Sequence, residues 1–182
     1  MEPLNIRFCG FGGQGIILSA ITLGTALVTK RGLHAVQTQS YGSEARGGQC
    51  QAELIVSEEP INSPHSAKKD ILVAMSQTAL DRYIGDLSPD GMLIIDPMLV
   101  TETHDTDVRV IEVPATETAT KLGNRIAGNM VILGFFQELT GMLTKDELLG
   151  AIEELVRPEF LEINTKAVEA GIELAKRHSL EA

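Results

Sequence analysis

Residues 10–15 form a glycine-rich motif near the start of the sequence. They read G-F-G-G-Q-G, a G-x-G-x-x-G pattern that follows a short apolar run and precedes a stretch with helical spacing. Glycine permits a tight turn and lets a phosphate approach the free N–H groups at a helix start, where the helix dipole favours an anion. The candidate ligand-binding residues of this turn are Gly12, Gly13, Gln14 and Gly15.

A dinucleotide-binding turn needs a further residue that this chain lacks. An acid about 20 residues on, at the end of the second strand, normally holds the ribose hydroxyls. Here that strand is expected to end in Thr38-Gln39-Ser40-Tyr41, without Asp or Glu. The sequence therefore disfavours NAD and leaves two interpretations open, a ligand with another kind of phosphate and a purely structural turn.

A second glycine-rich segment, residues 42–48, carries a single cation. It reads G-S-E-A-R-G-G, and Arg46 is the only Lys or Arg between Arg31 and Lys68. A guanidinium among glycines can bind a phosphate through two parallel hydrogen bonds. An exposed hairpin tip, with Glu44 as a surface partner of little energetic weight, explains the segment as well.

Strands and helices are expected to alternate along much of the chain. Periodicity and turn signals predict strands at 4–9, 34–41, 49–57, 71–75, 92–95 and 108–113. Helices are expected from 16 to near 32, from Ser76, at 115–122 and 129–140, from Thr144 to before Pro158, and at 159–177. Thr144 and Glu147 have the spacing of a capping box.

The fold class follows from the connections. Strands 34–41 and 49–57 are joined by only seven residues, which is too short for a parallel crossover, so they should form an antiparallel hairpin. The prediction is a single domain over residues 1–182, a three-layer α/β/α fold with a mixed, mainly parallel sheet containing one antiparallel hairpin. We expect the polar side chains of the hairpin on one face, either solvated or in a subunit interface: Gln37, Gln39, Gln49, Gln51 and Glu53.

Composition excludes several classes of function. The 182 residues carry a formal charge of −10, and residues 1–70 hold six Lys/Arg and six Asp/Glu, so the whole excess lies later. Without a basic patch, binding to nucleic acid or to an acidic lipid surface is not expected. Residues 8–29 carry no charge, but their glycines and Gln14 argue against a membrane span, and we interpret them as a buried crossover element.

The chain shows no catalytic or metal-binding constellation of its own. Cys9 and Cys50 are too few and too far apart for a zinc site or a self-contained iron–sulfur cluster, and a reducing cytoplasm fits them best. Neither a nucleophile with its base nor a pair of catalytic carboxylates is visible.

The two glycine motifs together resemble a known family. Gly10-Phe-Gly-Gly-Gln-Gly-Ile16 and Tyr41-Gly-Ser-Glu-Ala-Arg-Gly-Gly48 are similar to segments of the gamma subunit of 2-oxoacid:ferredoxin oxidoreductases, and to domain III of pyruvate:ferredoxin oxidoreductase. Asn129-Met130-Val131 and Glu162-Ile-Asn164 also match that pattern, which covers nearly the whole chain. The second motif looks most like the 2-oxoglutarate branch.

The resemblance implies a complex that oxidatively decarboxylates a 2-oxoacid, transfers the acyl group to coenzyme A and reduces ferredoxin. Thiamine diphosphate, magnesium and iron–sulfur clusters would belong to partner subunits, namely alpha, beta and, as a further candidate, a ferredoxin-like delta. This chain would help to hold coenzyme A and be inactive alone. Carried over by position, the turn at Gly12–Gly15 and the hairpin tip at Ser43, Arg46 and Gly47 would meet the ligand.

Two functions of other classes remain as alternatives. One is an independent nucleotide-binding oxidoreductase, which the missing acid after the second strand disfavours. The other is a structural assembly subunit without a ligand, against which the lone Arg46 at a glycine-rich tip argues.

Replacing Arg46 by alanine separates a ligand role from an interface role. If Arg46 contacts a coenzyme A phosphate, Arg46→Ala should cost about 1.5 to 3 kcal/mol of binding, roughly 10- to 150-fold in affinity, with assembly unchanged. If it pairs with a partner subunit, gel filtration should instead show dissociation while the surviving complex keeps its coenzyme A affinity. No change in either measurement would identify Arg46 as a solvated loop residue.

Overall fold

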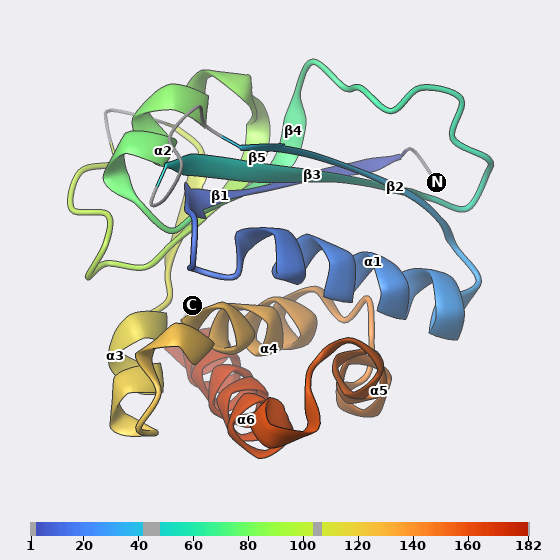
Figure 1. Ribbon diagram of the computed structural model, residues 1–182. Helices are drawn as coiled ribbons and strands as arrows, with labels where there is room; N and C mark the ends of the chain where they lie inside the picture. Colours follow the sequence, from blue (N-terminus) through green and yellow to red (C-terminus); the bar gives the residue numbers. More distant parts are fainter. Residues whose placement is uncertain (1–2, 42–47, 104–106, 182) are drawn as a thin grey trace.

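The computed structural model describes residues 3–41, 48–103 and 107–181. Six strands form one sheet in the order β2-β3-β1-β4-β5-β6 (Figure 1). Their bounds are β1 Leu4–Phe11, β2 His34–Tyr41, β3 Gln49–Ser57, β4 Lys69–Ala74, β5 Leu87–Ile95 and β6 Arg109–Glu112. The helices are α1 Ile16–Arg31, α2 Gln77–Tyr83, α3 Ala115–Lys121, α4 Gly128–Thr140, α5 Lys145–Leu155 and α6 Pro158–Glu181, with short 3-10 turns at Ile84–Asp86 and Arg125–Ala127.

The pairing of the strands confirms the mixed sheet. β2 pairs antiparallel with β3, and β3 pairs antiparallel with β1. The pairs β1–β4, β4–β5 and β5–β6 are all parallel. β1 is therefore the strand at which an antiparallel hairpin joins a parallel half-sheet.

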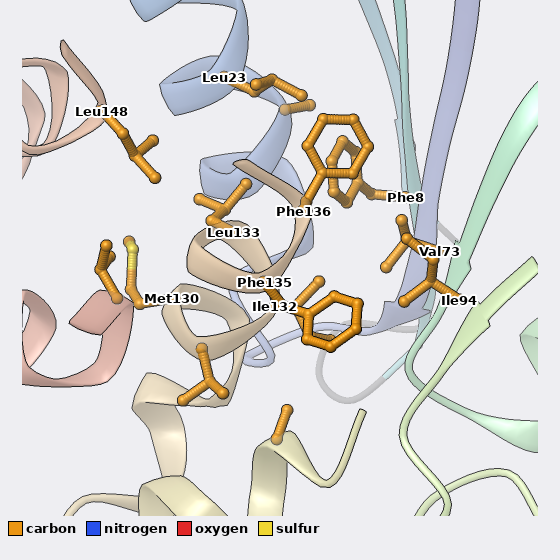
Figure 2. Close-up of a cluster of buried hydrophobic side chains, with 14 of the residues drawn as sticks. Phe8, Leu23, Val73, Ile94, Met130, Ile132, Leu133, Phe135, Phe136 and Leu148 are labelled. Carbon is orange, nitrogen blue, oxygen red and sulfur yellow. The ribbon is translucent and has the colours of Figure 1, made fainter. Parts of the chain in front are cut away.

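Helices cover both faces of the sheet, but unequally. On one face, α1 and α4 pack against the strands, with α5 and α6 farther from the sheet (Figure 1). Phe136 of α4 lies beside Phe8 of β1, and Phe135 lies near Val73 and Ile94 (Figure 2). The other face carries α2, whose Ala79 and Leu80 belong to a smaller apolar cluster.

Local sequence signals account for the ends of the helices. The Ser76 hydroxyl accepts a hydrogen bond from Ala79 N at 3.2 Å and caps α2. The Thr144–Glu147 capping box opens α5, as the spacing predicts. β5 begins earlier than predicted, at Leu87, and α6 extends to Glu181.

One prediction about the hairpin is wrong. Gln37 lies opposite Leu54 and Gln39 opposite Ala52, and residues directly opposite in an antiparallel pair share a face. These two glutamines therefore lie on the α1 side of the sheet, whereas Glu53, which is paired with Thr38, lies on the other.

Glu53 belongs to a buried ion-pair network instead of a solvated row. Its carboxylate accepts hydrogen bonds from Arg7 Nη2 at 2.5 Å and from Lys69 Nζ at 3.0 Å. Arg7 also pairs with Asp86 and lies 4.5 Å from the centre of the Tyr83 ring. Burial alone would raise the pKa of Glu53, but the hydrogen bonds from Arg7 and Lys69 outweigh it and hold that pKa below its usual 4.5.

Removing the Glu53 charge should destabilise the fold, because the buried Lys69 ammonium would lose its carboxylate. We expect Glu53→Gln to lower the free energy of unfolding by about 3 to 5 kcal/mol at neutral pH. The folded pKa lies below the unfolded one, so the Glu53 contribution is present above pH 4.5 and is lost as the pH falls through the folded value. Urea unfolding should show the gap between wild type and variant narrowing in acid, and an equal gap at every pH would contradict this role.

Candidate functional site

The glycine turn lies where the two halves of the sheet diverge. It follows the carboxyl end of β1, from which the chain enters α1 on one face. The neighbouring parallel strand β4 leads into α2 on the opposite face. Ligands of open α/β sheets bind in the crevice that such diverging connections leave at the carboxyl ends of strands. The topology thus places the turn at a binding position.

Gln14 fixes the shape of the turn with both ends of its amide. Its Oε1 accepts a hydrogen bond from Phe11 N at 2.6 Å, and its Nε2 donates to the Met75 carbonyl, just past β4, at 2.8 Å. A methyl group at Gly10 would come within 2.5 Å of that Oε1. Because main-chain groups bind both polar ends of the amide, Gln14 is a positioning residue. The sequence did not predict this role.

Gly13 and Gly15 both have positive φ, but their surroundings differ. Gly13 has φ +97°, and a methyl group added there would meet no protein atom within 4 Å. Gly15 has φ +74° and caps the start of α1, where a methyl group would collide with the amide of Asn129. Gly13 therefore faces open space, while Gly15 lets α1 and the start of α4 approach each other.

The second sequence motif ends beside the turn. Gly12 N donates to the Gly48 carbonyl at 2.9 Å, and Tyr41 lies opposite Cys50, which in turn lies opposite Gly10. Gly48 thus contacts the glycine turn, and Tyr41 lies two strands away from it at the same end of the sheet. Ser43, Glu44, Arg46 and Gly47 lie outside the described residues.

Two hollows meet at Gly13. The smaller, of about 160 Å³, is lined by Gly13, Gln14, Met75, Leu99, Thr116, Arg125 and Ile126. The larger, of about 350 Å³, is lined by Gly13, Gly15, Leu18, Asn124, Ile126, Ala127, Asn129, Met130, Leu155, Val156, Arg157, Phe160 and Asn164. Among residues 3–41, 48–103 and 107–181, each hollow has one arginine and no acidic residue in its lining. The two arginines favour the binding of an anion at this position.

A buried carboxylate holds one wall of the smaller hollow. Asp96 follows β5 and is fully buried. Its Oδ2 accepts a hydrogen bond from Thr116 N at 2.7 Å, and its Oδ1 accepts one from Met98 N at 3.0 Å. Asp96 thereby fixes the first turn of α3, which contributes Thr116 to the hollow.

The cysteines are not placed for shared chemistry. Cys9 and Cys50 belong to apolar clusters on opposite faces of the sheet. Burial raises the pKa of the Cys9 thiol to about 12. Within residues 3–41, 48–103 and 107–181, no three His, Cys, Asp or Glu side chains gather as a metal ligand set, and no helix has the length and apolar character to cross a membrane.

Several residues of the site gave no independent chemical signal in the sequence. Asn129 and Asn164 attracted notice only through the family pattern, and Arg125 and Phe160 not at all. Asn129 stands out in retrospect as a polar residue, 3% exposed, at the start of an otherwise apolar helix. Such a residue needs polar partners, and its Nδ2 lies 3.4 Å from the Gly15 carbonyl.

Comparison with known proteins identifies relatives along the whole chain. A family model described as "Pyruvate ferredoxin/flavodoxin oxidoreductase" matches residues 5–174. The 2-oxoglutarate synthase subunit KorC of Methanothermobacter marburgensis is 46% identical over 177 residues, covering 93% of this chain and 95% of KorC. KorC of Methanocaldococcus jannaschii is 41% identical, covering 94% of each chain.

Solved structures agree with this sequence comparison. The gamma subunit of a keto/oxoacid ferredoxin oxidoreductase from Geobacter sulfurreducens is 35% identical, with a TM-score of 0.86 over 97% of this chain and 98% of that one. A 2-oxoglutarate:ferredoxin oxidoreductase from Magnetococcus marinus, with 2-oxoglutarate, coenzyme A and succinyl-CoA bound, has a TM-score of 0.88 at 24% identity, over 97% of this chain and 32% of that chain. At that identity, the second structure supports the fold alone.

The contact between Gly15 and Asn129 can be measured by substitution at Gly15. Gly15→Ala should strain a left-handed backbone and also displace Asn129. Gly32→Ala, at the other end of α1, is a matched control, since Gly32 has φ +67° and no protein atom near its added methyl group. Both should lose about 1 to 2 kcal/mol of stability from backbone strain, and Gly15→Ala a further 1 to 3 kcal/mol, roughly, from the collision. Equal losses in thermal or urea unfolding would contradict the contact.

Proposed function

Because the chain belongs to the pyruvate ferredoxin/flavodoxin oxidoreductase family, as a gamma subunit of a 2-oxoacid:ferredoxin oxidoreductase complex, we propose that it completes the coenzyme A site of an enzyme acting on 2-oxoglutarate. The choice of 2-oxoglutarate rests on two relatives named as 2-oxoglutarate synthase subunit KorC, which are 46% and 41% identical to this chain. The chain contributes to binding and not to redox chemistry.

The observation that carries the coenzyme A proposal is the pair of hollows at Gly13. Coenzyme A is a long molecule with phosphates at one end and amides along its pantetheine arm. The phosphates need cations and free N–H groups, which Arg125, Arg157 and the start of α1 supply. The amides need polar partners in an apolar groove, for which Asn129 and Asn164 of the larger hollow are suited.

Each residue of the turn has a distinct role in this proposal. Gly13 leaves room for a phosphate beside the backbone, Gly12 is proposed to lie next to it in the turn, and Gly15 begins the helix whose dipole favours an anion. Gln14 holds the turn through Phe11 and Met75 and also lines the smaller hollow, where it remains a proposed ligand contact. Ser43, Arg46 and Gly47 of the hairpin link remain proposed contacts, supported by the meeting of Gly12 with Gly48.

The redox groups are assigned to other chains of the complex. Thiamine diphosphate with magnesium would activate the 2-oxoacid for decarboxylation, and iron–sulfur clusters would pass electrons to ferredoxin. The two cysteines of this chain, buried on opposite sheet faces, are unsuited to hold a cluster. Alpha and beta subunits, with a ferredoxin-like delta as a further candidate, are the proposed partners. By itself, the chain should reduce no acceptor.

Gly13 offers a direct test, because its missing side chain faces the hollows and not the protein. In the assembled complex, Gly13→Ala should raise the KM for coenzyme A by roughly tenfold or more, as the methyl group occupies ligand space. Decarboxylation measured without coenzyme A should be unchanged. Gly141→Ala is the control, because Gly141 also has positive φ and open space around it but caps the far end of α4.

The outcome separates the proposed role from its alternatives. A raised KM in Gly13→Ala alone supports the coenzyme A site. If both variants behave as wild type, the turn is structural and the chain serves assembly only. Reduction of an acceptor by the isolated chain with a nucleotide cofactor would instead indicate an independent oxidoreductase.

A further inference from the structure

The smaller hollow at Gly13 is lined largely by residues that follow successive strands of the parallel half-sheet. Gly13 and Gln14 follow β1, Met75 follows β4, Leu99 follows β5 and Thr116 follows β6. These strands lie side by side in the order β1-β4-β5-β6. The hollow is therefore built across four connecting segments, and its shape depends on how those segments are held relative to one another.

Asp96 holds two of these segments at the same time, namely the loop after β5 and the start of α3. Its carboxylate accepts hydrogen bonds from Met98 N at 3.0 Å and from Thr116 N at 2.7 Å. Its main-chain carbonyl also accepts a hydrogen bond from Leu99 N at 2.9 Å. Asp96 therefore sets the positions of Leu99 and Thr116, the lining residues that come from these two segments.

Helix capping alone does not explain a carboxylate at this position. Asp96 is fully buried, and in the part of the chain that the structure describes, no Lys, Arg or His forms an ion pair with it. A buried charge without a counter-ion has a large desolvation cost. The chain caps α2 with the neutral hydroxyl of Ser76 and α5 with that of Thr144, each of which accepts one main-chain N–H. The two oxygens of a carboxylate can instead bind N–H groups on two separate segments.

We propose that Asp96 is a positioning residue for coenzyme A, because it keeps Leu99 and Thr116 in place in the smaller hollow before the ligand binds. A lining that is already ordered does not have to be ordered by the ligand, so binding costs less free energy. Asp96 is not among the residues that line the hollow, so it acts on the ligand through these two residues. The inference rests on the proposed coenzyme A site.

Asp96→Asn tests this role, because the amide has the size of the carboxylate but only one acceptor oxygen. Its NH2 group would face the N–H of Met98 or of Thr116, donor against donor, and would release one of the two segments. In the assembled complex, the KM for coenzyme A should rise about fivefold or more, while kcat at saturating coenzyme A stays within about twofold. Loss of a negative charge beside an anion-binding hollow would by itself lower this KM, so charge and positioning predict opposite changes.

Asp70→Asn is the matched control. The Asp70 carboxylate also accepts a hydrogen bond from a main-chain N–H of another segment, Asn5 N at 2.7 Å, but it lies at the amino end of β4, away from the hollow. Both variants should have a lower melting temperature than wild type, since each replaces a charge-assisted hydrogen bond by a weaker one. Only Asp96→Asn should change the KM for coenzyme A.

Gly13→Ala, measured in parallel, separates this inference from the proposed function. A raised KM in both Asp96→Asn and Gly13→Ala, with a normal KM in Asp70→Asn, supports the positioning role. A raised KM in Gly13→Ala with an unchanged or lowered KM in Asp96→Asn overturns that role and keeps the coenzyme A site. An unchanged KM in both overturns the two proposals together. A raised KM in Asp70→Asn overturns the positioning role, because a general loss of stability would then account for the effect.

A second variant decides the question if Asp96→Asn prevents assembly of the complex. The double variant Leu99→Ala, Thr116→Ala removes the two side chains through which Asp96 acts and leaves its hydrogen bonds to the main chain intact. A raised KM for coenzyme A supports the positioning role. A KM equal to that of wild type overturns it.

Discussion

The position of β1 between an antiparallel and a parallel neighbour constrains the rest of the structure. Because β3 runs against it, the link between β2 and β3 lies at the carboxyl end of β1. Because β4 runs with it, Met75 lies at the same end. The glycine turn therefore has protein on both sides, contacting Gly48 on one and Met75 on the other. In an all-parallel sheet, β2 and β3 would not form a hairpin, and no hairpin link would lie beside the glycine turn.

Much of the fold was predictable because its signals are local. Hydrophobic periodicity, the capping box and the short link between two alternating runs each depend on residues close in sequence. The Glu53 network was not predictable, since its partners Arg7 and Lys69 lie on two other strands. The faces of the hairpin were also misassigned, because the side on which Gln37 lies depends on strand register, which the residues of the hairpin alone do not determine.

The features of the site likewise divide into those with a local sequence signal and those that depend on distant residues. Glycine spacing predicted the turn, since a tight turn is encoded within six residues. The function of Gln14 within it could not be predicted, because its acceptor is the carbonyl of Met75, 61 residues away. Arg125 and Phe160 come from a 3-10 turn and the final helix, and no spacing connects them to Gly13. A groove assembled from distant segments has no signature in any one of them.

The burial of Cys9 has a practical consequence. Burial raises the pKa of the Cys9 thiol to about 12, so little thiolate is present at neutral pH, and protein atoms surround the thiol near the carboxyl end of β1. A thiol-specific label can then react at an appreciable rate only when the sheet opens around that strand. Cys9 is thus a built-in reporter, whose labelling rate follows the opening of the strand that joins the two halves of the sheet.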